Sequence, residues 1–306
     1  MDWFYLAIIG HLANGVSFLI DKILLRSAFS RSATYAGLVG ILSFAVVVLV
    51  PFVDVWPSGL LWIVAAVSGA TFILALWAFF AALSRAEASR VVPIVGSLIP
   101  IMTLAGAFVF LGERLSDRTF IGFGVLILAT VLLSSGGKGK PSRETVWLAV
   151  TSALLFAIAS ITAKATYDAT GFLGGFIATR LFAAATALFL LLVIDRHAGK
   201  EALAIFHPGH QKTSKHKQPG KIAGILAIIG QTMGAAGFLF VQWATSQGSA
   251  SVVNAMQAVQ YALLVVVALA LTKKAPQLLG ENMTRKTLII KCAALALCAI
   301  GMYLIV

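Results

Sequence analysis

Charged residues are scarce in this chain: Asp, Glu, Lys and Arg together make up 11% of its 306 residues. Hydrophobic residues make up 60%, and the mean hydropathy is +0.97. A soluble domain carries roughly 25% charged and roughly 45–50% apolar residues, and each of its helices needs one polar face. The composition therefore argues against a water-soluble globular protein and predicts an all-α integral membrane protein.

Cysteine is almost as rare, with two residues in the whole sequence. Cys292 and Cys298 fall on the same predicted helix, where the helical rise separates their Cα atoms by about 9 Å. A disulfide requires a Cα separation below about 7 Å. The two thiols are therefore not expected to pair, and they give no information on the redox compartment.

Motifs of enzyme catalysis are missing. No Ser/His/Asp set, HExxH, P-loop or GxGxxG after a strand occurs in a usable context. The loop 197–221 holds His207, His210 and His216 among lysines, but without paired Cys or Asp ligands at a recognised spacing. We predict a protein that is not an enzyme and has no cofactor or metal, with a membrane-embedded lipid-modifying enzyme as the minor alternative.

Long uncharged stretches take the place of these features. A membrane-spanning helix needs about 20 predominantly apolar residues. The stretch 222–272 is far too long for one crossing, and Gln247-Gly248-Ser249 offers a polar turn that divides it into two spans. With it counted twice, ten transmembrane helices are predicted within 3–20, 32–53, 55–84, 91–112, 119–137, 145–163, 169–194, 222–272 and 287–306. Two of these stretches carry a single charged residue each, Arg180 in 169–194 and Lys291 in 287–306.

Lysine and arginine are distributed unevenly between the loops that join these spans. Nineteen of the 23 lie on one side, Arg114, Arg118 and Lys164 lie on the other, and Arg180 lies inside the seventh span. Because cytoplasmic loops carry the excess, we expect a multi-pass cell-membrane protein with both termini extracytoplasmic. The net charge of +12 indicates anionic lipids at the cytoplasmic face as partners. A nucleic-acid partner is not predicted, because the basic residues are not interleaved with aromatics in one patch.

The two halves of the chain correspond weakly and in the same order. LAIIGHLANGVSFLIDK, ending at Lys22, aligns with LAVTSALLFAIASITAK, ending at Lys164. RVVPIVGSLIP at 90–100 aligns with SVVNAMQAVQY at 251–261. Because each half has an odd number of spans, the halves would have opposite membrane orientation. The predicted organisation is a first repeat over 1–137, a basic linker over 138–145 and a second repeat over 146–306.

Residues 87–133, EASRVVPIVGSLIPIMTLAGAFVFLGERLSDRTFIGFGVLILATVLL, carry a more specific pattern. An alanine-rich entry leads into the fourth span with Pro100, followed by the turn LGERL at 111–115 and a glycine-rich fifth span with Gly122. This pattern resembles the core of an EamA domain of the drug/metabolite transporter superfamily. The second half departs from it, with Tyr261 where Pro100 falls and Lys273-Lys274 where Gly112-Glu113 falls.

The resemblance implies ten helices in two inverted five-helix repeats, which enclose a central cavity and rock against each other in alternating access. Members of the family carry amino acids, sugars, nucleotide sugars and drugs, so the resemblance names a mechanism and not a solute. Members usually have a cytoplasmic amino terminus, whereas the loop charges of this sequence place it on the opposite side.

Polar residues inside spans indicate function by default, with helix packing as the alternative. In the first span, His11, Asn14, Phe18 and Asp21 fall within about 100° of one helix face, which is predicted to point inward. His11 is either a packed, hydrogen-bonded histidine or a proton relay. Small multidrug relatives carry a glutamate in the region where this chain has Asn14, which argues against proton-coupled export of cationic drugs.

The ninth span carries the main candidate site. Asn254, Gln257 and Tyr261 fall within about 60° of one face, with Gln260 one step to the side. Unpaired donors that face lipid cost free energy, so these groups face either a neighbouring helix or a hydrated cavity. We predict a substrate-binding cavity, opposite the fourth span. Its further walls are predicted to be Gln231 and Trp77.

Four charged residues have a structural interpretation, and for Arg180 and Lys164 a contact with the solute is the alternative. Arg180 lies about 12 Å into the seventh span, where it either snorkels to the headgroups or coordinates an anionic group of the solute. Lys164, at the end of the sixth span, is interpreted as a snorkelling anchor rather than a substrate contact. Glu87 and Glu113, beside arginines, are interpreted as turn and cap salt bridges.

Together these features predict a secondary transporter that moves a small polar organic solute by alternating access. The prediction rests on the inverted halves, on Pro93 and Pro100 as helix breakers in the fourth span, and on the amide-rich later spans. The alternative is a non-transporting membrane scaffold or assembly protein, which would lack a polar cavity at mid-membrane. The sequence leaves open the solute, the direction, the coupling ion and assembly into a homo-oligomer.

Overall fold

The computed structural model describes residues 2–24, 31–86, 88–134, 141–205, 221–271 and 285–305. Every regular element in these ranges is a helix, which confirms the predicted all-α class. The predicted histidine loop with His207, His210 and His216 lies outside the described residues, as do Glu87 and positions 138–140 of the predicted linker.

The chain forms two compact units. Unit 1 comprises Met1–Arg26, Glu87–Pro141 and Pro219–Val306, and unit 2 comprises Ser27–Ala86 and Ser142–Gln218. Each unit therefore takes helices from both halves of the sequence. The predicted repeats are defined by sequence correspondence, and their boundaries differ from those of the compact units.

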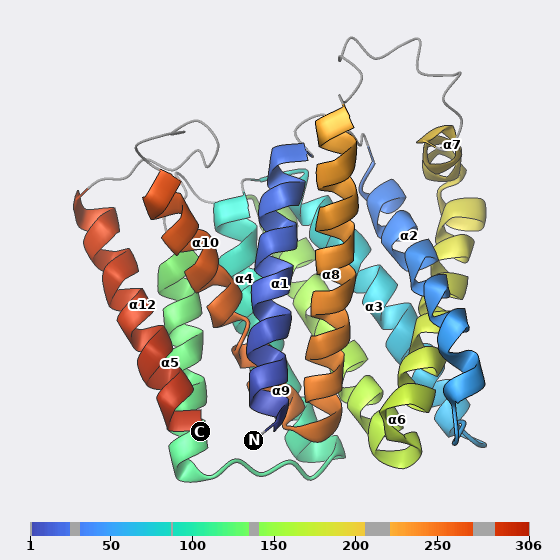
Figure 1. Ribbon diagram of the computed structural model, residues 1–306, viewed down its shortest axis with the longest axis horizontal. Coiled ribbons are helices and arrows are strands. Elements are labelled where there is room, and N and C mark those ends of the chain that lie inside the picture. Colours follow the sequence, from blue (N-terminus) through green and yellow to red (C-terminus); the bar gives the residue numbers. More distant parts are fainter. Residues whose placement is uncertain are drawn as a thin grey trace. The chain divides into compact units, whose positions relative to one another are not determined.

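Unit 1 is built from pairs of packed helices (Figure 1). Its helices are α1 (Asp2–Leu24), α4 (Ala88–Phe110), α5 (Asp117–Ser134), α8 (Lys221–Gln247), α9 (Ala250–Ala255), α10 (Ala258–Leu271) and α12 (Arg285–Ile305). Helix α1 packs along α8, α5 along α12, and α4 against α9. Glycines allow this close approach: a Cβ on Gly237 would lie 2.7 Å from the Gly10 carbonyl oxygen, and one on Gly122 would lie 3.0 Å from that of Gly301.

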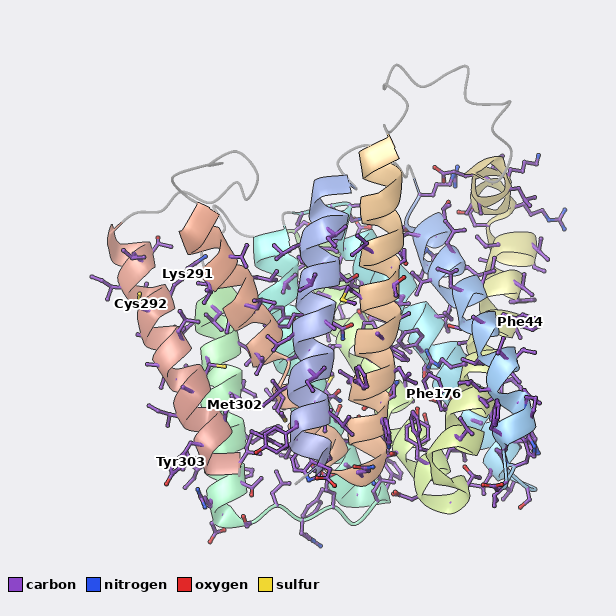
Figure 2. All side chains as sticks on the ribbon, viewed as in Figure 1. Phe44, Phe176, Lys291, Cys292, Met302 and Tyr303 are labelled. Atoms are coloured by element: carbon purple, nitrogen blue, oxygen red, sulfur yellow. The ribbon has the colours of Figure 1, made fainter. Side chains whose placement is uncertain are left out.

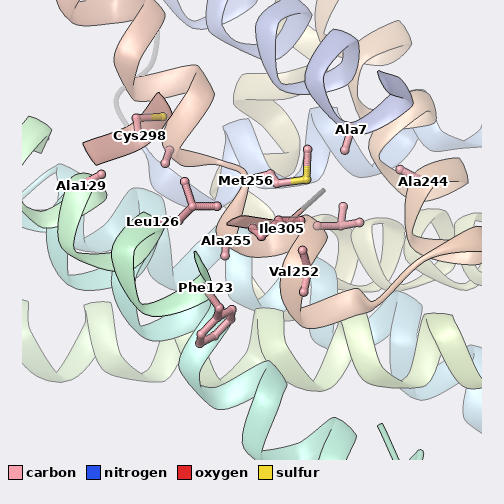
Figure 3. Close-up of a cluster of buried hydrophobic side chains, with 12 residues drawn as sticks. Ala7, Phe123, Leu126, Ala129, Ala244, Val252, Ala255, Met256, Cys298 and Ile305 are labelled. Atoms are coloured by element: carbon pink, nitrogen blue, oxygen red, sulfur yellow. The ribbon is translucent and has the colours of Figure 1, made fainter. Parts of the chain in front are cut away.

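The apolar core of unit 1 surrounds the short connection between α9 and α10. Met256 in this connection, Leu126 of α5 and Ala244 of α8 are each 0% exposed, and Phe123 of α5 is 4% exposed (Figure 3). The connection is therefore enclosed by protein rather than lying in a surface loop.

Unit 2 contains a helix that turns back on itself. Its elements are α2 (Ser32–Leu42), η1 (Ser43–Phe52), α3 (Leu61–Leu83), α6 (Arg143–Phe189), η2 (Leu190–Ile194) and α7 (Arg196–Ile205). The 47 residues of α6 would extend about 70 Å as one straight helix, over twice the thickness of a bilayer core. Gly171, with φ 74° and ψ 170°, divides α6 into two arms in a conformation that only glycine adopts readily.

Helix α3 contacts both arms of α6. Ser68 Oγ donates to the Ala159 carbonyl of the first arm at 2.9 Å. A Cβ on Gly69 would lie 2.5 Å from the Thr179 carbonyl of the second arm. The hydroxyl of Ser68 and the adjacent Gly69 thus let α3 contact both arms of the α6 hairpin.

The outer faces of both units carry large apolar side chains, as expected of helices surrounded by lipid. Phe44 is 58% exposed and Tyr303 is 72% exposed (Figure 2); such extensive apolar exposure is rare in soluble proteins. Six described segments are long and apolar enough to cross a membrane: Asp2–Ile20, Ser32–Phe52, Leu61–Leu83, Arg143–Ile194, Ala250–Val267 and Thr287–Ile305. The protein is therefore a multi-pass membrane protein, as predicted.

Three local expectations can be compared with the helices. The prediction that Pro93 and Pro100 break the fourth span is wrong, because α4 is helical through both. The first arm of α6 continues past Lys164, which lies within the helix and forms an ion pair with Asp168 at 2.7 Å. Cys292 and Cys298 lie on α12 and are free, as their spacing predicts.

Candidate functional site

The predicted ninth span is interrupted between α9 and α10, at Met256 and Gln257. In a continuous helix the Gln257 amide would donate to the Val253 carbonyl. Here it donates to the Asn254 carbonyl at 3.2 Å, and the Val259 amide donates to the Met256 carbonyl at 2.9 Å. This tightening to a three-residue spacing leaves the Val253 carbonyl without its regular backbone donor.

The side chain of His11 supplies the donor that the interruption removes. His11 Nε2, from α1, lies 2.9 Å from the Val253 carbonyl oxygen, and the residue is 5% exposed. Because a carbonyl oxygen only accepts, Nε2 must carry the proton. The structure therefore uses His11 as a hydrogen-bonded, packed histidine at the interruption, and it connects the first span to the ninth.

One polar side chain on each side of the interruption, Asn254 before it and Tyr261 after it, contacts α4. Asn254 Nδ2 donates to Thr103 Oγ1 at 3.1 Å, and the Thr103 hydroxyl in turn donates to the Ile99 carbonyl at 2.8 Å. The ring of Tyr261 packs on Gly96, where an added Cβ would lie 2.7 Å from Tyr261 Oη. The ninth span thus lies against the fourth span, which is the span that the predicted cavity was expected to face.

Gln257 and Gln260 remain half-buried. The predicted 60° sector assumed a continuous helix, and this assumption is wrong because the helical spacing changes at the interruption. Gln257 belongs to the interruption itself, whereas Gln260 lies in the first turn of α10. Gln260 approaches α1, since a Cβ on Gly15 would lie 3.5 Å from its Cγ.

Asn14 and Gln231 have surroundings that differ from those of the ninth-span amides. A Cβ on Gly237 of α8 would lie 2.4 Å from Asn14 Oδ1, so the Asn14 carboxamide packs on α8. Gln231, also on α8, is exposed. Asn14 therefore contributes to the contact between α1 and α8, and Gln231 is not enclosed by the described residues of unit 1.

Trp77 and Arg180 belong to unit 2, whereas the other predicted site residues belong to unit 1. Trp77 is half-buried and packs against an apolar cluster that includes Ala183 and Ala187. Arg180, in the second arm of α6, is 3% exposed, and its Cζ lies 4.3 Å from the centroid of the Phe72 ring. A guanidinium stacked on an aromatic face gains cation–π attraction.

The turn at Gly171 brings Arg180 towards a buried tyrosine of the first arm. Arg180 interacts electrostatically with Tyr167, although thirteen positions along a straight helix would separate them by about 20 Å. Tyr167 is 2% exposed. Arg180 is thus enclosed by aromatic side chains of its own unit, so within unit 2 it does not extend along the surface as a snorkelling side chain does.

The LGERL turn has a structural role at the start of α9. Gly112 has φ 64°, and the Glu113 amide donates to the Ala107 carbonyl at 3.1 Å, which ends α4 as a glycine-dependent cap does. The Glu113 carboxylate accepts a hydrogen bond from Ser249 Oγ. Ser249 Oγ also accepts from the Val252 amide at 3.0 Å and so caps α9. Glu113 thus contributes to a cap, but through a hydrogen bond with Ser249 where a salt bridge was predicted.

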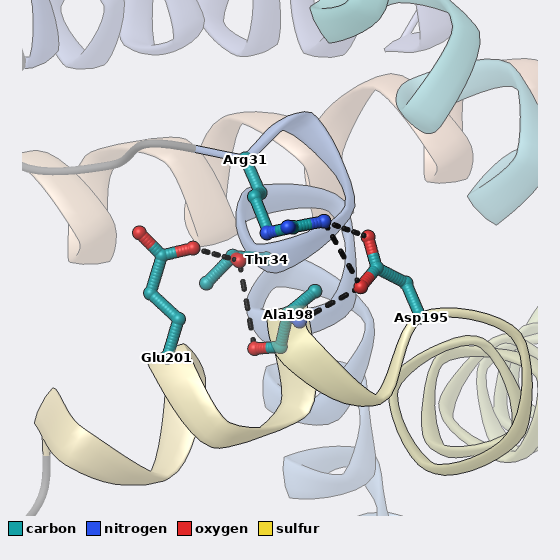
Figure 4. A network of polar contacts seen from close by, with 5 residues as sticks. All are labelled: Arg31, Thr34, Asp195, Ala198 and Glu201. Atoms are coloured by element: carbon teal, nitrogen blue, oxygen red, sulfur yellow. Dashed lines mark hydrogen bonds and ion pairs between the residues drawn. The ribbon is translucent and has the colours of Figure 1, made fainter.

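A second polar network holds α7 onto α2 in unit 2 (Figure 4). Arg31 Nη1 lies 3.1 Å and 3.3 Å from the two carboxylate oxygens of Asp195, and the Ala198 amide donates to Asp195 Oδ1 at 3.0 Å. Thr34 donates to Glu201. Asp195 follows the apolar segment Arg143–Ile194, and the Ala198 amide, with help from Arg31, lowers the pKa of its carboxyl group.

Helix α7 is amphipathic. Ala198 and Ala202 are buried against unit 2, whereas Arg196, Lys200 and Leu203 are exposed. One basic and apolar face therefore remains uncovered by the described part of the chain. Among the described residues, no group of three or more His, Cys, Asp or Glu side chains is placed to hold a metal ion.

Sequence reasoning missed Thr103, Ser249 and the interruption itself. A hydroxyl such as Thr103 gives no signal of its own, since it lies among apolar residues where serine and threonine commonly bond to their own helix. The sequence around Met256 and Gln257 contains neither proline nor glycine. The one available signal was the alignment of this stretch with the proline-bearing fourth span.

Comparison with known proteins supports the resemblance. Residues 1–135 match the model of the EamA-like transporter family, a family of the drug/metabolite transporter superfamily. One crystal structure of a protein is similar over 98% of this chain and 96% of its own, with a TM-score of 0.65 and 18% sequence identity. At that identity the likeness concerns the fold alone. No curated protein matches the chain.

Proposed function

We propose that this protein is a secondary carrier that moves a small polar organic solute across the membrane by alternating access, because residues 1–135 match the model of the EamA-like transporter family. The match to a transporter family supports a transport function. The polar side chains of the ninth span, Asn254, Gln257 and Gln260, supply groups that a solute could contact. The residues proposed to contact the solute are those around the interruption of the ninth span.

The proposed carrier has ten crossings, arranged as two inverted sets of five. The crossings are α1, α2 with η1, α3, α4, α5, the two arms of α6, α8, α9 with α10, and α12. In unit 1 the start of α1 and the end of α12 lie at the same end of the helices (Figure 1), as an even number of crossings requires.

The observation that carries the proposal is the interruption at Met256 and Gln257. Backbone groups without regular partners are costly in a bilayer, so irregular backbone persists there only where protein or a hydrated cavity surrounds it. Transporters use discontinuous helices near the bilayer midplane to bind their solutes. In this chain the half-buried amides of Asn254, Gln257 and Gln260 accompany the interruption, and they offer both donors and acceptors to a polar solute.

The rival function is a membrane scaffold or assembly protein. It is favoured by the bonds from Asn254 to Thr103 and from His11 to Val253, because helix packing alone also produces such bonds. The two functions differ in flux, since a scaffold need not move any solute.

Counterflow into liposomes that contain the purified protein separates the two functions. Amino acids, sugars and nucleosides, each labelled outside preloaded vesicles, form a suitable panel. A carrier gives saturable uptake that depends on preloading with the same solute. A correctly folded protein that gives no saturable uptake of any candidate would favour the scaffold.

We further propose that α7 contacts anionic lipid headgroups at the cytoplasmic face. Its exposed Arg196 and Lys200 supply positive charge, and the exposed Leu203 supplies apolar area, the combination that holds amphipathic helices in the interface. With this face cytoplasmic, the loop charges place both termini outside. A fluorescent protein fused after Val306 that is found in the cytoplasm would overturn this orientation.

A further inference from the structure

His11 has one nitrogen that the packing of unit 1 does not use. Its Nε2 donates to the Val253 carbonyl, but its Nδ1 is buried and has no hydrogen-bond partner among the described residues. More than about 90% of buried polar groups in proteins have a partner. A histidine that served packing alone would be expected to satisfy both nitrogens.

The surroundings of His11 favour the neutral ring. Helix α1 packs against α8 and α10 and bonds to α9. The described parts of these three helices contain no Asp or Glu, and their ionisable groups are Lys221 at the start of α8 and Tyr261. On α1 itself, the ionisable residues are Asp2, Tyr5, Asp21 and Lys22, near the helix ends. No carboxylate lies close to His11 in sequence, so a charged imidazolium would be poorly stabilised in this interior.

In a neutral ring that carries its proton on Nε2, Nδ1 is a hydrogen-bond acceptor. The bond to Val253 also fixes the orientation of the ring, because the helix interruption places that carbonyl beside α1. Nδ1 is therefore a pre-oriented acceptor, and the half-buried Gln260 of α10 approaches the same helix α1 about one turn further on, at Gly15.

We propose that His11 Nδ1 accepts a hydrogen bond from an N–H or O–H group of the transported solute, and that His11 thereby selects solutes that carry such a donor. The inference rests on the proposed carrier function and narrows its substrate class to hydroxyl-, amine- or amide-bearing solutes. A solute whose polar atoms only accept hydrogen bonds would leave Nδ1 unsatisfied, and discrimination against such analogues is strong when a buried polar group loses its partner.

Two substitutions of His11 separate the roles of its nitrogens. The side-chain amide of His11→Gln reaches the position of Nε2 and keeps the donor to Val253, but places no acceptor where Nδ1 lies. The shorter amide of His11→Asn reaches the position of Nδ1 and loses the bond to Val253. Ser17→Ala, on the same helix, is the matched control, since Ser17 is buried beside Gly234 of α8 and away from Val253.

Counterflow should compare a solute that the wild type transports with its analogue methylated at the donor. We expect the wild type and Ser17→Ala to prefer the parent solute by about tenfold or more. His11→Gln should lose that preference while its thermal stability stays near wild type, and His11→Asn should keep it with lower thermal stability. A His11→Gln variant that retains the wild-type preference would overturn the inference.

A measurement on the wild type keeps the inference testable if His11→Gln does not fold. In protein labelled with ¹⁵N-histidine, addition of the transported solute should shift a non-protonated Nδ1 resonance, and the methylated analogue should not. Equal spectra with and without the solute would contradict the inference. If the wild type transports none of the panel, the proposed carrier function fails instead, so the two failures are distinguishable.

Discussion

Replacing Asn254 by alanine should affect stability and transport to different extents. In the structure its Nδ2 donates to Thr103 Oγ1 at 3.1 Å in a partly buried position. Loss of one neutral hydrogen bond of this kind costs about 0.5–1.5 kcal/mol of unfolding free energy. If the amide also binds the solute, recognition should weaken by a further 1–3 kcal/mol or about 5- to 150-fold in uptake at low solute concentration.

Thr103→Val is the matched control for this prediction. It removes the same hydrogen bond, together with the bond from the Thr103 hydroxyl to the Ile99 carbonyl of its own helix, but leaves the Asn254 amide in place. It should therefore lose at least as much stability as Asn254→Ala and transport almost normally. Thermal unfolding in detergent measures the first effect, and initial counterflow rates measure the second. The double variant should be about as stable as either single one, because the two substitutions remove one shared bond.

Two results would refute this reasoning. If Asn254→Ala transports like the wild type, its amide has no role beyond the bond to Thr103. If Asn254→Ala fails to fold while Thr103→Val remains stable, the amide is structural in another way. Gln257→Ala should reduce transport in the same way while the bond from Asn254 to Thr103 stays intact. Gln247 is exposed at the end of α8, so Gln247→Ala should change neither stability nor transport.

Three further predictions concern unit 2. Arg180→Lys keeps the charge but loses the planar donors and the stacking on Phe72, so counterflow of a carboxylate or phosphate solute should fall several-fold; unchanged flux would indicate a structural cation. Gly171→Ala should lower the unfolding free energy by about 1–3 kcal/mol because of its φ of 74°, whereas Gly124→Ala, in open space within α5, should not; equal thermal stability of the two variants would refute this. The pKa of Asp195 is lowered in the folded protein. Its ionised carboxylate therefore adds to the free energy of unfolding above the ordinary pKa of about 3.9, and this stabilisation is lost as the pH falls through the lower pKa of the folded state. Thermal unfolding from pH 6 to pH 2 should show this loss in the wild type and not in Asp195→Asn, and identical profiles would contradict it.

The membrane class could be predicted from the sequence because it depends on local composition. An uncharged stretch of membrane length predicts α3 directly, and a stretch with Lys291 as its only charge predicts most of α12. The spacing of His11 and Asn14 placed both on an inward face, and the structure packs one on α9 and the other on α8. Hydropathy and helical periodicity determine which face is buried without reference to a particular neighbour.

The interruption of the ninth span could not be predicted in this way. Ala255-Met256-Gln257-Ala258 consists of good helix formers, and the proline-bearing α4 is the continuous helix of the pair. What accompanies the interruption is a tertiary contact, the donation from His11 to Val253, between residues 242 positions apart. Hydropathy also gives no information on which helices are neighbours, so the mixing of both sequence halves in each compact unit was not foreseen.

Cysteine labelling at position 257 tests most directly whether the interrupted ninth span forms an alternating-access site. Gln257→Cys would be made in a Cys292→Ser, Cys298→Ala background, and charged thiol reagents would be applied from either side of oriented vesicles. We predict that the thiol at position 257 reacts from both sides, and that the transported solute slows this reaction in a saturable manner. A thiol at position 257 that reacts from neither side, in a variant that folds normally, would contradict the central claim that this interruption lines the transport path.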